Sequence, residues 1–109
     1  MDPQGERIAR NEAAYREVNE AIRAGRADQA ADAPRPFVCE CGRLGCNELV
    51  ELTLGEYEAV RANPRRFLML PGHEIPEVEH VERHDGYVVA EKGQEAAAVA
   101  EDTDPRTGG

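Results

Sequence analysis

All three cysteines of this chain, Cys39, Cys41 and Cys46, fall within eight consecutive positions, and this cluster constrains the fold more than any other feature of the sequence. Thiols that crowd together in an odd number suit metal ligation better than the disulfide framework of a secreted protein. Structural zinc takes four sulfur or nitrogen ligands in a tetrahedron, so a fourth ligand is needed. His73, in a Pro-Gly turn that follows an apolar run, is the favoured candidate. The sequence predicts a zinc site that joins two remote parts of the chain.

Other groups can be considered for the fourth position. Glu40, Glu74 or a water molecule would each supply an oxygen ligand. His80 and His84 are four residues apart, but the Asp-Gly pair beside them indicates a hairpin strand, on which they would be surface residues. A redox-active thiol cluster, or cysteines with no ligand role, are the alternatives to the metal site itself.

Size and patterning favour a single small domain. The chain has 109 residues, and the stretch that combines strand and helix patterns is shorter, about residues 37–92. Domains of roughly 50 to 60 residues bury little apolar surface, and a structural metal often compensates.

The N-terminal part of the chain has the pattern of one amphipathic helix over residues 6–24. Its apolar positions recur at helical spacing and are Ile8, Tyr15, Val18 and Ile22. The polar residue Asn11 lies in the same stripe along the helix. This stripe can dock onto its own domain, or Tyr15, Val18 and Ile22 can bind a partner or a second copy of the helix. Residues 25–36 have no apolar period and end in two prolines, which predicts a linker after a helical arm over residues 1–24.

Short strands and one helix are predicted for residues 37–92. Residues 37–38 and 48–52 would form a hairpin around the cysteines, with Gly42 and Gly45 at positive backbone angles. Thr53 and Glu56 form a capping box that starts a helix ending near Ala62, because Asn63-Pro64 disfavours its continuation. Residues 67–70 follow as a buried strand.

The last predicted hairpin joins residues 77–84 to residues 87–92 through Asp85-Gly86. A two-residue turn predicts three facing pairs, which are His84 with Tyr87, Val81 with Ala90, and Glu79 with Lys92. Neither face is cleanly apolar, so this hairpin is expected at an edge. Residues 94–100 should form a short alanine-rich helix, and residues 101–109 a disordered tail.

The predicted fold is therefore α+β: a small zinc-ribbon-like domain of short antiparallel strands plus one helix, preceded by an N-terminal amphipathic helix. The expected organisation is a helical arm (1–24), a linker (25–36), a zinc-binding domain (37–92), and a short helix with a tail (93–109).

The charge of the chain narrows the choice of partner. Its 22 acidic residues against 13 basic ones give a net charge of −9, which favours a basic protein partner over nucleic acid. The compact basic run is limited to Arg61, Arg65 and Arg66. No apolar stretch approaches the roughly 20 residues that span a membrane, and the first residues lack a signal-peptide pattern, so a cytoplasmic protein is expected.

Catalysis is not expected from this sequence. A three-ligand zinc could hold an activated water beside Glu74, but the stretch that starts at His73 has Glu77 where a His-Glu-x-x-His motif needs its second histidine. The paired motifs of a zinc deaminase are missing as well.

Several segments together resemble a set of small, functionally uncharacterised proteins of high-GC Gram-positive bacteria. They are residues 11–12, 16–20, 37–42, Cys46, 51–54, 56–61, 64–67 and 71–74. The resemblance implies no particular activity. It does imply that the cysteine cluster and the Pro-Gly-His-Glu turn belong to one unit.

Overall fold

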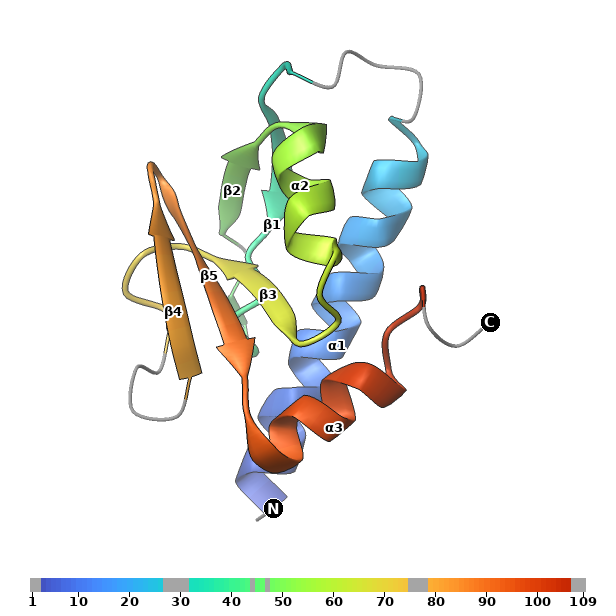
Figure 1. The fold of residues 1–109 in the computed structure, drawn as a ribbon, viewed down its shortest axis with the longest axis vertical. Coiled ribbons are helices and arrows are strands. Elements are labelled where there is room, and N and C mark those ends of the chain that lie inside the picture. The colour runs from blue at the N-terminus through green and yellow to red at the C-terminus, as the bar shows by residue number, and fades with distance from the viewer. Residues whose placement is uncertain (1–2, 27–31, 44, 47, 75–78, 107–109) are drawn as a thin grey trace.

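The computed structural model describes residues 3–26, 32–43, 45–46, 48–74 and 79–106. Within these residues the chain forms three helices and five strands (Figure 1). In chain order they are α1 (Pro3–Ala24), β1 (Arg35–Val38), β2 (Leu49–Leu52), α2 (Leu54–Arg61), β3 (Arg66–Met69), β4 (Glu79–His84), β5 (Tyr87–Lys92) and α3 (Gln94–Asp102). The predicted α+β class is confirmed.

The strands make two small antiparallel sheets. β1 pairs with β2, and the second sheet has the order β3-β5-β4. The register of the β4–β5 hairpin is the predicted one, with His84 opposite Tyr87, since Gly86 takes the positive φ of 85° that a two-residue turn requires.

The hairpin lies at one end of the three-stranded sheet, as predicted, with β4 as the edge strand, but β5 is the central strand. Tyr87 to Ala90 are all buried, because β3 pairs with the other side of β5 and makes it the central strand. Glu79 faces Lys92 in the backbone register as predicted. The ammonium of Lys92 also forms a buried ion pair with Glu12 of α1.

The core lies between α2 and the two sheets. Thr53 and Glu56 form the predicted capping box of α2, and Tyr57 on this helix stacks on Phe37 of β1 with 4.5 Å between ring centroids. Because α2 packs against β3, the aromatic stack connects the two-stranded sheet to the three-stranded one.

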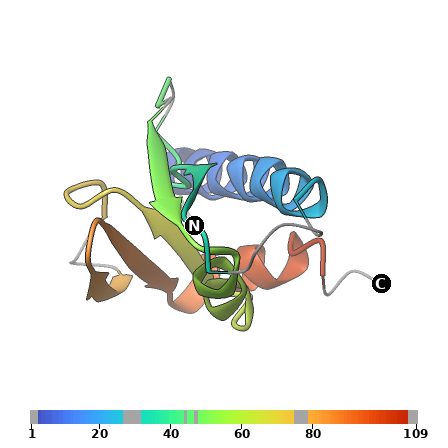
Figure 2. The ribbon, with the colours of Figure 1, turned by 90° about the horizontal axis from the view of Figure 1, so that it is seen from above.

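Helix α1 docks onto the domain through a face that its apolar pattern did not indicate. It runs beside β1 and α3, and in Figure 1 α1 lies to the right of the β3-β5-β4 sheet; Figure 2 shows the same elements from above. Its buried residues recur every three or four positions and are Ala9, Glu12, Ala13, Arg16 and Asn19. Arg16 is fully buried and donates to the carbonyl oxygens of Pro64, at 2.7 Å, and Ala100, at 2.6 Å.

The ends of the predicted segments also differ from the structure. Arg35 and Pro36, expected in the linker, belong to β1, while residues 27–31 lie outside the described part. Asp104, expected in a disordered tail, is buried and ion-paired with Arg61, and Arg106 pairs with Glu20. Residues 107–109 are not described. None of the described helices combines the length and apolar character needed to cross a membrane.

Candidate metal centre

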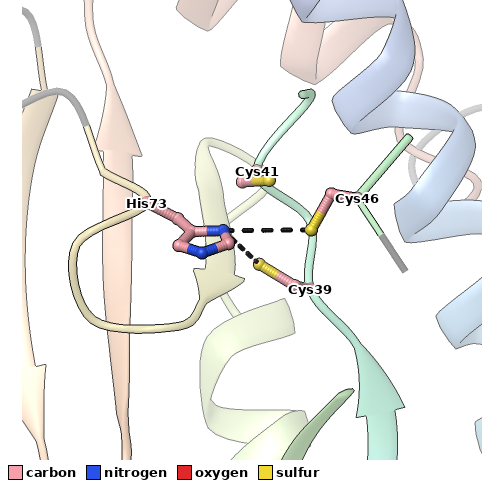
Figure 3. A group of neighbouring side chains, drawn as sticks. All are labelled: Cys39, Cys41, Cys46 and His73. Carbon is pink, nitrogen blue, oxygen red and sulfur yellow. Dashed lines mark hydrogen bonds between the residues drawn. The ribbon is translucent and has the colours of Figure 1, made fainter. Parts of the chain in front are cut away.

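The three cysteines and His73 come together from two parts of the chain that are far apart in sequence. Cys39 and Cys41 directly follow β1, Cys46 lies on the connection to β2, and His73 lies in the turn after β3 (Figure 3). Their four potential ligand atoms all lie within 4.8 Å of one another. Nδ1 of His73 is 3.6 Å from Sγ of Cys39 and 3.8 Å from Sγ of Cys46. All four predicted ligand residues therefore form one group that can hold a metal ion.

The backbone around the cysteines takes the conformation that such a group needs. Gly42 and Gly45 have φ angles of 75° and 83°, in the left-handed region that favours glycine. The N–H of Cys46 donates to the carbonyl of Arg43 at 3.1 Å. The N–H of Leu70 donates to Sγ of Cys39 at 3.3 Å, a contact that favours the thiolate form.

Backbone hydrogen bonds hold this cysteine segment between the two sheets. The N–H of Cys39 donates to the carbonyl of Glu48, at 3.0 Å, and the N–H of Glu40 donates to the carbonyl of Leu68 in β3, at 2.8 Å. The segment therefore extends the β1–β2 ladder on one side and contacts β3 on the other. Because His73 follows β3 after a short turn, the contact with β3 places the imidazole beside the thiols.

Burial makes the thiols costly to ionise without a cation. Cys39 and Cys41 are buried, and desolvation raises the pKa of Cys39 to about 12 and raises the pKa of Cys41 as well. Hydrogen bonds from the backbone of Leu70 and Arg43 oppose this desolvation in part. A bound divalent cation would supply the charge that stabilises the thiolates, and its binding would release protons.

The alternative oxygen ligands point elsewhere. Glu40 is fully buried, and its carboxylate accepts hydrogen bonds from Nδ2 of Asn19, at 2.7 Å, and from the N–H of Leu68, at 3.0 Å. The carboxylate of Glu74 accepts from the N–H of Gly72, at 2.7 Å, and from Arg83, at 3.1 Å. Neither carboxylate belongs to the four-residue group.

The alternative histidines lie on β4 and outside the group. His80 is exposed, and the ring of His84 stacks on Tyr87 with 4.7 Å between centroids. Both are surface residues of the hairpin, as their sequence context predicted.

The residues proposed for partner binding do not share one exposed surface. Val18 is 46% exposed, Tyr15 is half-buried, and Ile22 packs against the core.

Sequence reasoning missed the contacts that α1 makes with the cysteine segment through Asn11 and Asn19. The sequence feature that could have indicated these contacts is a series of polar residues at helical spacing, Glu12, Arg16 and Asn19. Without the rest of the fold, such a series has the pattern of a solvent-exposed helix face.

The fold and the site together define a small α+β protein with a group of three cysteines and one histidine that can bind a metal ion. Comparison of the chain with protein-family models, with curated proteins and with solved structures finds no match.

Proposed function

We propose that this chain is a small cytosolic zinc-binding protein, whose metal is structural, and that it acts as a protein interaction or regulatory module. The observation that carries the proposal is the convergence of three thiols and one imidazole within 4.8 Å. This set of soft sulfur and borderline nitrogen donors suits tetrahedral zinc better than the oxygen-preferring cations. The β1–β2 hairpin with its two glycine turns would be the ribbon-like part of the site.

A structural role is favoured over a catalytic one. Four protein ligands fill a tetrahedral zinc, so no position is left for an activated water. Glu74, the residue that sequence reasoning considered as a general base, forms an ion pair with Arg83 at 3.1 Å. We therefore infer that the protein is not a zinc hydrolase.

A protein partner is favoured over nucleic acid. Each arginine of the basic run that could bind phosphate has an acidic partner within the domain. Arg61 pairs with Glu20 and Asp104, Arg65 pairs with Glu101, and Arg66 pairs with Glu91. The acidic balance of the chain fits a basic partner, and the exposed side of α1 around Val18 is the surface that we propose for it or for a second copy.

Native mass spectrometry of the protein, as isolated and after chelation, tests the proposal. We expect one zinc ion per chain, and loss of helical circular dichroism once the zinc is removed. A protein that is isolated without metal and shows the same melting curve with and without added zinc would contradict a structural zinc site.

A redox switch is the second candidate, and the exposure of Cys46 favours it. Cys46 is partly exposed, whereas Cys39 and Cys41 are buried, so an oxidant can reach one of the candidate ligands. Dilute peroxide should then release zinc from the wild type. Full zinc retention under those conditions would exclude this role.

A further inference from the structure

The side chain of Asn19 contacts the strand that leads into the cysteines. Asn19 is fully buried in α1. Its Oδ1 accepts from the N–H of Val38, at 2.8 Å, and its Nδ2 donates to the carbonyl of Val38, at 2.8 Å. One side-chain amide thus satisfies both backbone groups of Val38, as a residue on a neighbouring strand would do.

The same amide also holds the residue between the first two cysteines. Nδ2 of Asn19 donates to Oε2 of Glu40, at 2.7 Å, while Oε1 of Glu40 accepts from the N–H of Leu68 in β3. Because neighbouring side chains of an extended segment point to opposite sides, Glu40 faces α1 while the flanking thiols face His73. Asn19 therefore contacts the residues on both sides of Cys39.

A second contact fixes the residue after Cys41. Nδ2 of Asn11 donates to the carbonyl of Gly42 at 3.1 Å. A Cβ atom on Gly42 would lie 2.8 Å from the carbonyl oxygen of Ile8 and 2.7 Å from Cγ of Glu12. The backbone of α1 and that of the cysteine loop therefore approach each other too closely for any larger residue.

We propose that Asn19 is a positioning residue for the metal centre and that docking of α1 is coupled to metal binding. Residues 38, 40 and 42 are all held by α1, so the thiols of Cys39 and Cys41 are arranged before a metal arrives. By thermodynamic linkage, a metal that binds this arrangement must in turn favour the docked helix. The inference rests on the proposed zinc site and gives the docked helix α1 a role in arranging the metal ligands.

The test compares the zinc affinity of Asn19→Ala and wild-type protein by competition with a chromophoric chelator. Residues that orient metal ligands typically contribute about 10- to 100-fold to affinity, so we expect at least about a tenfold loss. Asn19→Asp keeps the shape and the acceptor for Val38 but loses both donated bonds, and it should lose affinity to a similar extent.

Two control variants separate positioning from a general loss of stability. Arg23→Ala removes the 2.5 Å contact of α1 with Glu58, away from the cysteine segment. Tyr57→Phe removes the 2.9 Å hydrogen bond from the tyrosine hydroxyl to Glu20 without leaving a cavity. Urea unfolding of each zinc-loaded variant gives its stability. We expect both controls to bind zinc within about threefold of wild type, a smaller change than that expected for a ligand-orienting residue.

The outcomes distinguish the two proposals. If the wild type binds no zinc, the proposed function fails and the inference fails with it. If the wild type binds zinc and Asn19→Ala binds it equally well, only the positioning role is overturned. The same conclusion follows if Asn19→Ala loses no more zinc affinity than a control variant of equal stability.

Discussion

His73 provides the sharpest test of the idea that a metal joins two parts of this fold. In the four-residue group, His73 comes from the turn after β3 and lies 27 residues from Cys46, the nearest of the cysteines in sequence. Removing it should leave the three thiols together but release their link to that turn. Because the zinc would still hold the three thiols together, the loop that His73 closes starts at Cys46 and has 27 residues, and the loop-closure relation for a cross-link predicts a stabilisation of about 3.5 kcal/mol. We expect His73→Ala to lose up to this amount in the zinc-loaded protein.

Urea unfolding of wild type and His73→Ala, each with zinc and after chelation, measures this contribution. The loss should be large with zinc and small without it, because the cross-link exists only when a metal is bound. His80→Ala is the matched control, since His80 is exposed on β4, and its effect should stay within about 0.5 kcal/mol. An equal loss with and without zinc, or no loss at all, would refute the cross-link.

Two further predictions concern the contacts around the site. Gly42→Ala and Gly45→Ala impose the same kind of backbone strain, but only at Gly42 does the new Cβ meet α1. In urea unfolding, Gly42→Ala should therefore lose about 1–3 kcal/mol more stability than Gly45→Ala loses. Equal losses in the two variants would argue against tight docking of α1. Hydrogen bonds from Arg106 hold the pKa of Glu58 below its usual value. The ionised Glu58 therefore stabilises the fold at pH values above the ordinary carboxyl pKa, and this stabilisation is lost as the pH falls through the lowered pKa of the folded protein. The difference in unfolding free energy between wild type and Glu58→Gln should be below about 1 kcal/mol, because the ion pair is partly exposed. This difference should shrink as the pH is lowered from about 6 to about 3. A difference that grows on acidification would contradict the prediction.

Local interactions account for what could be predicted well. The capping box of Thr53 and Glu56 starts α2, and the turn at Asp85-Gly86 sets the register of the last hairpin. Both features involve residues close in sequence, so they depend little on the rest of the fold. The spacing of the cysteines likewise indicated a metal ligand set, because few other roles need three thiols within eight positions.

Sequence patterns were sufficient to predict most elements, the turns and the cysteine cluster, whereas the surfaces that these elements bury depend on contacts between distant parts of the chain. Arg16 shows why: burying a charged side chain is unfavourable unless it is hydrogen-bonded, and its partners, Pro64 and Ala100, lie 48 and 84 residues away. A polar helix face gives no sign that such distant carbonyl groups will meet it. The position of His73, rather than Glu40, beside the thiols has the same origin, because the contact of the cysteine segment with β3 brings the imidazole to the thiols, while the Glu40 carboxylate contacts α1.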